Sequence, residues 1–322
     1  MLVLGIDTSC DDTSVAVYDA TGNRVLSNIV SSQYSFHREF GGVVPEIAAR
    51  KHAENIDLVF DEALRVAGVK VKELSLICTT NRPGLLPALL VGLTFGKGLS
   101  YSLSLPFKAV HHIEAHIFSP FIGSEPQYPF IALVVSGGHT LIVLVESLGR
   151  YRLLGKTLDD AVGEAYDKVA KLLGLGYPGG PVIDRLYREY GGEFLELPRP
   201  RVKGFNYSFS GIKTAVRRLV EKGYPPPQIA ASFQETAISY LLGKLKKVVK
   251  ETGVKRVAVS GGVSANSLLR ERLKELGLEL HLPPLEYTSD NGAMVAYAGY
   301  RRFLLEGEDS LEVGAFARSP IA

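Results

Sequence analysis

Two histidines four residues apart, His112 and His116, stand in the hexapeptide HHIEAH. On a helix this spacing places the two imidazoles on one face, one turn apart. Two imidazoles in that position can bind one cation if a third ligand comes from elsewhere in the chain. A bare pair of this kind is more often two histidines on a solvent-facing turn, so the spacing alone does not establish a metal site.

The same segment does not fit a zinc-protease motif. That motif needs a glutamate directly after the first histidine, where it can act on the metal-bound water. Here Glu114 stands two residues after His112, roughly 200° further round a helix. The inverted motif needs a glutamate directly before the second histidine, and Ala115 occupies that place.

Two segments read as a strand that runs into a glycine turn, Val134–Gly138 and Ser260–Val263. Glycine lets the backbone approach a ligand closely, and such turns can offer N–H groups to a phosphate. An ordinary tight turn explains either segment alone, but two copies at corresponding places favour ligand contact. The segment Gly92–Lys97 is not a P-loop, because it has three residues between its glycines and no hydroxyl residue after the lysine.

Several carboxylates stand beside glycine-rich or turn segments. Asp167 and Asp184 flank the glycine-rich stretch 174–181, and a carboxylate there can accept hydrogen bonds from the hydroxyls of a ribose. Asp167 can equally pair with Lys171, four residues on. Asp290 precedes an apolar run, where it could cap a helix or act as a metal ligand.

The elements that must position these residues occur twice in the same order. The first series comprises strands over 2–7, 14–18 and 24–32, a helix over 45–67 and a strand over 74–79. The second comprises strands over 130–135, 140–146 and 151–154, a helix over about 160–173 and a strand over 254–260. A β-hairpin plus a third strand, then a helix and a further strand, repeated once, predicts an internal duplication.

This pattern predicts an α/β protein with a duplicated RNase H-like fold, resembling the superfamily of actin, the Hsp70 ATPases and the sugar kinases (ASKHA), with two lobes around a nucleotide cleft. The predicted N-terminal lobe is 1–125, completed by a C-terminal helix over about 291–322. The predicted C-terminal lobe is 126–290. Fold alone does not decide the function.

Composition sets broad limits. The 322 residues carry 36 basic and 34 acidic side chains, and this net charge of +2 neither requires nor excludes a nucleic-acid partner. Two cysteines cannot form a disulfide framework, which favours a reducing cytoplasm. The N-terminal apolar run is too short for a signal peptide, and the longest apolar stretch, 85–95, is too short for a membrane span. We therefore expect a cytoplasmic protein with no membrane partner.

Taken together, the motifs resemble the tRNA threonylcarbamoyladenosine synthase family in its bacterial, TsaD-type form, formerly described as glycoproteases. The resemblance covers nearly the whole chain. It rests on Gly5–Thr13, Phe40–Glu46, His112–His116, Ser136–Thr140, Thr157–Asp160, Gly174–Pro181, Tyr207–Gly211, Ala231–Gln234 and Asp290–Asn291.

The resemblance implies a set of site residues. It implies one divalent metal ion per subunit, iron or zinc, held by His112, His116 and Asp290. It implies that a bound adenylate and its acyl phosphate contact Val134, Val135, Ser136, Gly137 and Gly138. Its nucleoside would contact Asp167, Gly180, Asp184 and Asn266.

The resemblance also implies a reaction and partners. The exocyclic amine of the adenosine next to the anticodon, in tRNAs reading ANN codons, would attack the carbonyl of threonylcarbamoyl-AMP and release AMP. A metal that polarises the acyl group fits this chemistry, and no serine or cysteine nucleophile is required. Besides tRNA and the adenylate, the family depends on a paralogous subunit and a small ATPase, of the bacterial TsaB and TsaE type.

The sequence departs from the family pattern in two regions. Asn81-Arg82 and Pro87 stand where glycine and proline residues are usual, which puts local loop geometry in question. His111 replaces an asparagine, which leaves open whether it competes as a ligand. The basic and aromatic segment Arg199–Tyr207 is a candidate tRNA contact, or else a solvated loop.

Two other functions are compatible with such a fold. An ATPase or phosphotransferase of the same superfold would turn over ATP without tRNA. A non-catalytic scaffold would keep its role when His112 or Asp290 is changed.

Overall fold

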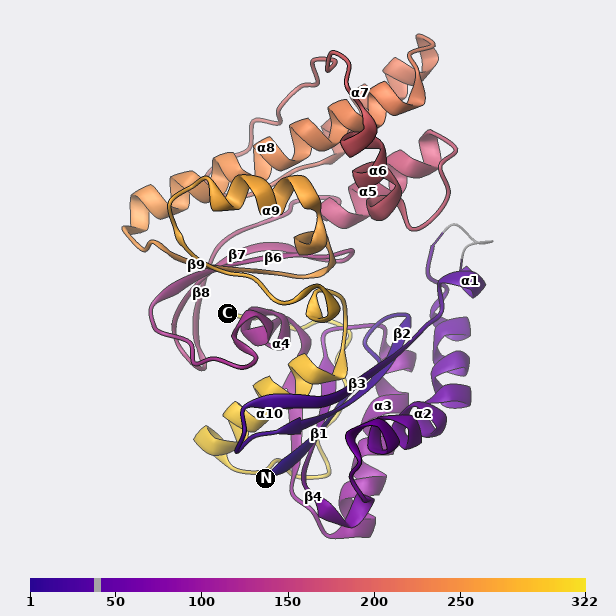
Figure 1. Ribbon diagram of the computed structural model, residues 1–322, viewed down its shortest axis with the longest axis vertical. Helices are drawn as coiled ribbons and strands as arrows, with labels where there is room; N and C mark the ends of the chain where they lie inside the picture. The colour runs from indigo at the N-terminus through magenta and orange to yellow at the C-terminus, as the bar shows by residue number, and fades with distance from the viewer. Residues whose placement is uncertain (38–41) are drawn as a thin grey trace. The chain divides into compact units, whose positions relative to one another are not determined.

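The chain divides into two compact units in the computed structural model, which describes residues 1–37 and 42–322 (Figure 1). Unit 1 comprises Met1–Pro126 together with Ser289–Ile321, and unit 2 comprises Gln127–Thr288. Part of the motif Phe40–Glu46 therefore lies outside the described residues. Because the chain returns to unit 1 at Ser289, Asp290 belongs to the same unit as both histidines, whereas the predicted boundary assigned it to the C-terminal lobe.

Unit 1 is built on a five-stranded sheet in the order β3-β2-β1-β4-β5. Its strands are β1 (Leu2–Asp7), β2 (Asp12–Asp19), β3 (Arg24–Ser32), β4 (Leu74–Arg82) and β5 (Phe107–His111). The first three strands are antiparallel neighbours, and β4 and β5 run parallel to β1. Side chains alternate along β1, so Leu4 and Ile6 join the core beneath the helices α2 (Pro45–Ala67) and α3 (Leu86–Leu103), while Gly5 faces the helix α10 (Gly292–Glu306).

The helices of unit 1 are α1 (Tyr34–His37), α2 (Pro45–Ala67), α3 (Leu86–Leu103), α4 (His112–Phe118) and α10 (Gly292–Glu306), with short 3₁₀ turns at Val71–Glu73 and Ser119–Phe121. Proline in the first turn starts both α2 and α3, because its missing N–H has no partner in a helix at that point. Pro87, the departure from the family pattern, is that residue in α3. Gly68, with φ 67°, ends α2 in the left-handed conformation that glycine adopts freely.

Unit 2 has a second five-stranded sheet, in the order β10-β9-β6-β7-β8. Its strands are β6 (Phe130–Val135), β7 (Thr140–Ser147), β8 (Arg150–Lys156), β9 (Arg256–Ser260) and β10 (Glu279–His281). Its helices are α5 (Val162–Leu172), α6 (Gly179–Glu189), α7 (Ser210–Glu221), α8 (Pro226–Thr252) and α9 (Ser267–Lys274), with 3₁₀ turns at Gly262–Ala265 and Leu285–Tyr287.

The two sheets have the same topology. When β6 to β10 are set against β1 to β5, the strand order and every parallel or antiparallel pairing agree. The predicted duplication is therefore confirmed. Helix α4 follows β5, the last strand of the first sheet, and α10 follows β10, the last strand of the second sheet. The two histidines on α4 and Asp290 just before α10 therefore stand at equivalent places in the two repeats.

Helix α10 begins in direct contact with the backbone of the first sheet. A Cβ on Gly292 would lie 2.6 Å from Ala16 N and from Gly5 O, so only glycine permits this approach. Gly292 N also donates to Ser14 Oγ at 2.8 Å. These contacts fix the start of α10, and with it the neighbouring Asp290.

Helix α10 ends at Glu306, so the prediction of a helix continuing to 322 was wrong. Gly307, with φ 78°, stops it, and its N–H donates to Phe303 O. The remaining chain runs back along unit 1, where Phe316 N donates to Asn81 O at 3.0 Å and Asn81 Nδ2 donates to Gly314 O at 2.9 Å. The unusual Asn81 thus anchors the C-terminal segment.

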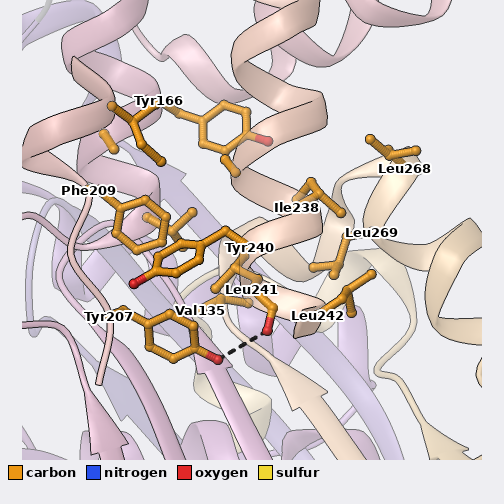
Figure 2. Packing of buried hydrophobic residues seen from close by; sticks show 14 of the residues in the cluster. Val135, Tyr166, Tyr207, Phe209, Ile238, Tyr240, Leu241, Leu242, Leu268 and Leu269 are labelled. Atoms are coloured by element: carbon orange, nitrogen blue, oxygen red, sulfur yellow. Dashed lines mark hydrogen bonds between the residues drawn. The ribbon is translucent and has the colours of Figure 1, made fainter. Parts of the chain in front are cut away.

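The core of unit 2 contains aromatic side chains from the predicted tRNA segment and its neighbours (Figure 2). Tyr207 and Phe209 are fully buried and pack against Tyr240 of α8, and the Tyr207 hydroxyl donates to Leu241 O at 3.3 Å. Tyr207 is therefore a structural residue and cannot stack on a nucleic-acid base. Across the described ranges, no helix has both the length and the apolar character of a membrane span.

Candidate metal and nucleotide sites

The three candidate metal ligands lie together in unit 1. His112 and His116 occupy the first and fifth positions of α4, and Asp290 comes just before α10. Their Nε2 atoms lie 3.5 Å and 3.0 Å from Asp290 Oδ1, and one ligand atom from each of the three residues lies within 4.8 Å of the others. His116 is fully buried, whereas the Asp290 side chain is 23% exposed, so the group is accessible from the Asp290 side.

These distances suit a shared ion. Two donors bound at about 2.1 Å to one ion lie about 3.0–3.4 Å apart in octahedral or tetrahedral geometry. The two nitrogen-to-oxygen distances of 3.5 Å and 3.0 Å are close to that range. Two imidazoles and one carboxylate form a donor set typical of zinc and of non-haem iron, with positions left for a further ligand. The residues present therefore fit a divalent metal ion.

His111 is not part of this group. Its Nδ1 accepts a hydrogen bond from Ile113 N at 3.2 Å and so caps the start of α4. Burial, followed by the charges of Arg82 and His112, lowers the pKa of His111 to about 4. A neutral capping imidazole explains this departure from the family pattern.

Asp290 is not a helix cap. The capping residue of α10 is Asn291, whose Oδ1 accepts from Met294 N at 2.9 Å. Of the two roles that the sequence allowed for Asp290, the structure favours that of a ligand.

His112 carries an unusually stable proton in the metal-free protein. Burial disfavours its charged form, but the carboxylates of Asp290 and Asp7 outweigh burial and raise the pKa of His112 to about 9. A cation that binds Nε2 must therefore displace a proton at neutral pH.

The turn after β1 and the first residue of β2 add two buried carboxylates, Asp11 and Asp12, near this group. Asp11 and Asp12 are 9% and 8% exposed, and Asp12 Oδ1 has no hydrogen-bond partner among the residues that the structure describes. Burial, followed by the charges of Asp11 and Asp290, raises the pKa of Asp12 to about 8. Asp12 is therefore largely protonated at neutral pH.

Asp12→Asn should make stability less sensitive to pH. Because folding raises the pKa of Asp12, the folded protein binds the proton that the unfolded chain releases above pH ~4, and stability falls as the pH rises towards 8. The Asp12 carboxyl lowers the free energy of unfolding by up to about 1.4 kcal/mol for each pH unit in this interval. Thermal unfolding at pH 5 and pH 8 should show the variant gaining stability over the wild type as the pH rises. A difference that does not change with pH would contradict the assignment.

The predicted phosphate turn lies at the end of β6 in unit 2. Ser136 N donates to His139 O at 2.8 Å, and His139 N donates to Ser136 Oγ at 3.1 Å, which closes the turn. Gly137 and Gly138 are exposed, and a Cβ on either would meet no atom within 4 Å. Space is therefore left above the two glycines, where a ligand could approach the backbone.

Asp167 and Gly180 lie together at the start of α6. Asp167 Oδ1 accepts from Gly179 N at 2.7 Å, so this carboxylate caps the helix rather than pairing with Lys171. Gly180, the next residue, borders open space. A helix start with an adjacent carboxylate can bind a polar ligand such as a nucleoside.

Asp184 and Asn266 form part of a network centred on Gln234 of α8. Gln234 Nε2 donates to Asp184 Oδ1 at 2.8 Å, and Asn266 Nδ2 donates to Gln234 Oε1 at 2.9 Å. Asn266 Oδ1 also accepts from Leu269 N and caps α9. Ser267 Oγ donates to Asp184 Oδ1 at 2.7 Å. A nucleoside at these positions would have to share acceptors that the fold already uses.

No role was predicted for Gln234, although it stands in a motif of the resemblance. Its amide is fully buried and therefore needs partners for both its donor and its acceptor, but that burial is a property of the fold that the sequence does not display. Asp7 and Ser9, which face His112, were likewise assigned no role.

Fold and site together define a class of protein. Two units of identical sheet topology, one with a His–His–Asp group and the other with an open glycine turn, characterise a duplicated RNase H-like α/β protein with a candidate metal centre.

Solved structures share this fold. A full-length HypF in a phosphate- and nucleotide-bound form matches with a TM-score of 0.62 at 15% identity, over 96% of this chain and 56% of its own. A ROK-family glucokinase from Streptomyces griseus matches with a TM-score of 0.51 at 12% identity, over 94% and 99%.

The chain belongs to the tRNA N6-adenosine threonylcarbamoyltransferase (TsaD) family, whose model matches residues 24–297. A relative of that name from Persephonella marina is 54% identical over 95% of this chain and 92% of its own length. Another, from Thermus thermophilus, is 50% identical over 100% and 99%. The predicted family and fold class are thus confirmed.

Proposed function

We propose that this chain transfers the threonylcarbamoyl group from threonylcarbamoyl-AMP to the exocyclic amine of the adenosine next to the anticodon in tRNAs reading ANN codons, with release of AMP. The observation that carries the proposal is the convergence of His112, His116 and Asp290 in a chain about half identical to transferases of that name. Anticodon-loop bases suit such an acceptor role, because they can be splayed into a pocket without melting a helix.

His112, His116 and Asp290 would hold one divalent ion, iron or zinc, by their Nε2 and carboxylate oxygen atoms. When bound, such an ion supplies Lewis-acid polarisation of an acyl oxygen. The two histidines stand on the buried helix α4, and Asp290 directly precedes the cap of α10, so packed elements of the fold hold all three side chains before substrate binds. No residue of the chain needs to form a covalent intermediate, since the acyl group arrives already activated.

The turn Val134–Gly138 would receive the phosphate of the adenylate. Its two exposed glycines leave room for an anion to reach backbone N–H groups. Asp167 and Gly180 would contact the ribose or base from the start of α6. Asp184 and Asn266 would complete this side through the network that Gln234 organises.

Gly137→Val should weaken adenylate binding without unfolding the protein. The added side chain would enter the open space over the turn, and loss of hydrogen bonds to a charged phosphate should cost about 10- to 100-fold in affinity. Isothermal titration with a non-hydrolysable adenylate analogue measures the effect. Gly191→Val, also in unit 2 with no atom near its Cβ, is the control and should bind normally. Equal affinity of the two variants would remove the turn from the site.

A basic stretch in unit 2 would contact the tRNA backbone. Residues 199–222 contain seven basic residues and one acidic residue, a net charge of +6 in a chain whose total is +2. Six of the seven are exposed, and none of the six has an ion-pair partner within the described part of the chain: Arg199, Arg201, Lys203, Arg217, Arg218 and Lys222.

This stretch is also held in place. Lys244 Nζ donates to Val202 O at 3.2 Å and to Gly204 O at 2.6 Å, which fastens the loop to α8. Asp159 accepts from Phe209 N at 2.7 Å and from Ser210 Oγ at 2.7 Å, which secures the start of α7. A backbone that is already held in place loses less conformational entropy when the cations it carries bind phosphates.

Arg217→Glu/Arg218→Glu should therefore weaken tRNA binding and flatten its salt dependence. Each lost phosphate contact should lower the slope of log affinity against log salt by about 0.7–0.9. The double variant Lys255→Glu/Lys274→Glu changes the charge of unit 2 equally at other exposed lysines. Filter-binding titrations across a range of salt concentrations compare the two. If both variants lose affinity alike, the effect is one of net charge and not of this stretch.

The function itself is tested by reconstitution. The chain is mixed with unmodified tRNA, threonylcarbamoyl-AMP, and the paralogous subunit and small ATPase that we propose as its partners, and the tRNA nucleosides are then analysed. The amount of threonylcarbamoyladenosine formed should increase in proportion to the amount of this protein added. Brisk ATP hydrolysis without tRNA, and no modified nucleoside, would instead support a phosphotransferase.

A further inference from the structure

The two ring nitrogens of His112 face different groups. Nε2 points towards Asp290, with Oδ1 at 3.5 Å, and is the atom offered to the ion. Nδ1 lies 3.1 Å from Ser9 Oγ and 3.4 Å from Asp7 Oδ2, on the opposite side of the ring. Whether His112 can act as a ligand depends on which of these nitrogens carries the proton when the imidazole is neutral.

Asp7 is the last residue of β1 and is fully buried. Its Oδ1 accepts from Ser9 N at 3.0 Å, which fixes the plane of the carboxylate. Its Oδ2 has no hydrogen-bond partner among the described residues, although it is shielded from water. A buried carboxylate oxygen is costly to leave unsatisfied, and the polar atom it faces is His112 Nδ1.

Ser9 and Asp7 are not equivalent neighbours of that nitrogen. A serine hydroxyl can donate or accept, so Ser9 is compatible with either tautomer of His112. An ionised carboxylate only accepts, so Asp7 requires the proton to be on Nδ1. We propose that Asp7 is a positioning residue that holds the Nδ1 proton of His112 and thereby directs the Nε2 lone pair towards the metal ion. This inference rests on the proposed metal centre but not on the transfer reaction.

The other histidine lacks such a partner. His116 Nδ1 is buried and forms no hydrogen bond within the described part of the chain. Asp7 should therefore influence one of the two imidazoles only. That asymmetry gives the proposal a signature that a general loss of structure would not produce.

The decisive variant is Asp7→Asn, which keeps the size of the side chain. If its carbonyl oxygen continues to accept from Ser9 N, its NH₂ group takes the place of Oδ2 and donates to Nδ1. The ring proton then moves to Nε2, the wrong tautomer for a ligand, an effect that carboxylate-to-amide changes beside histidines produce elsewhere. Loss of such an outer partner typically costs about 10- to 100-fold in metal affinity.

Zinc affinity is measured at neutral pH by competition with a chromophoric chelator, and unfolding temperature is recorded in excess chelator. We expect Asp7→Asn to bind zinc about 10- to 100-fold more weakly, and Ser9→Ala to stay near the wild type. Asp12→Asn is the matched control, since Asp12 is a buried aspartate at the start of the neighbouring strand β2, and no hydrogen bond or ion pair joins it to His112 in the described chain. It should bind zinc normally.

A second measurement needs no variant. Long-range ¹H–¹⁵N spectra of the zinc-loaded wild type should show His112 protonated at Nδ1 and metal-bound at Nε2. A proton on Nε2, or Asp7→Asn binding zinc as tightly as Asp12→Asn, would overturn the proposal. A wild type that binds no zinc would overturn it together with the metal centre, whereas absent tRNA modification would leave the zinc result intact.

Discussion

Asp290→Ala should abolish tRNA modification while the protein stays folded. Its carboxylate belongs to the proposed His–His–Asp metal site, and loss of the electrostatic stabilisation that this site would provide should lower the rate by at least about 100-fold. The fold should survive, because Asn291 caps α10 and the Asp290 side chain is partly exposed. The reconstituted nucleoside assay measures the rate, and bound metal is quantified on the same sample.

The three ligands should also behave as a unit. The double variant His112→Ala/Asp290→Ala should be no slower than either single variant, because removing one member already disables the group. Adenylate binding to unit 2 serves as the control for folding and should be retained in all three proteins. A single variant that kept normal activity with no bound metal would contradict the metal centre and revive the scaffold alternative.

Gly292→Ala should both destabilise the protein and impair metal binding. The new Cβ would lie 2.6 Å from two backbone atoms of β1 and β2, and backbone cannot move aside as a flexible side chain can. Overpacking of this kind costs about 1–3 kcal/mol, and it would displace the start of α10 together with Asp290. Thermal unfolding and zinc affinity measure the two consequences.

Its matched control is Gly243→Ala. Gly243 lies within α8, and a Cβ there would meet no atom within 4 Å. Alanine should therefore raise stability by up to about 1 kcal/mol, because it favours helix more than glycine does. If Gly292→Ala behaved like Gly243→Ala, the contact between α10 and the sheet would not be close enough to position Asp290.

Much of the fold follows from the sequence where an element is bounded by clear turn signals. The strands over 2–7, 24–32 and 130–135 and the helix over 45–67 have their predicted bounds, because glycine, proline or polar turns delimit apolar runs there. Strand β5 was not predicted, since its buried Lys108 interrupts the apolar pattern. That lysine is compensated by Asp309 at 3.0 Å, far along the chain. Strand β10 was also not predicted, because its three residues are too few to show an alternating pattern.

Helix α8 was missed for a different reason. Its first two-thirds are buried nearly all round, because it contacts several helices at once, so no single apolar stripe marks it in the sequence. The longest helix of unit 2 therefore has a weak helical signature.

The candidate site was only partly predictable. The spacing of His112 and His116 allowed a metal pair without establishing one, and Asp290 was added to the pair through the family resemblance, since 174 positions separate it from His116. The partners that act on these residues, Asp7 beside His112 and Gln234 beside Asp184, depend on tertiary contacts. Spacing along the chain carries no information about such contacts.

That separation of 174 positions has a consequence for biosynthesis. His116 leaves the ribosome long before Asp290, and all of unit 2 is made in between. At about 5–20 residues per second the interval lasts roughly 10–35 seconds. During it the histidines lack the Asp290 carboxylate, so an ion held as we propose would be fully coordinated only after residue 290 has been made. Metal loading would thus act as a checkpoint of completed synthesis, since a chain that stops before residue 290 lacks both the third ligand and the helix that holds it.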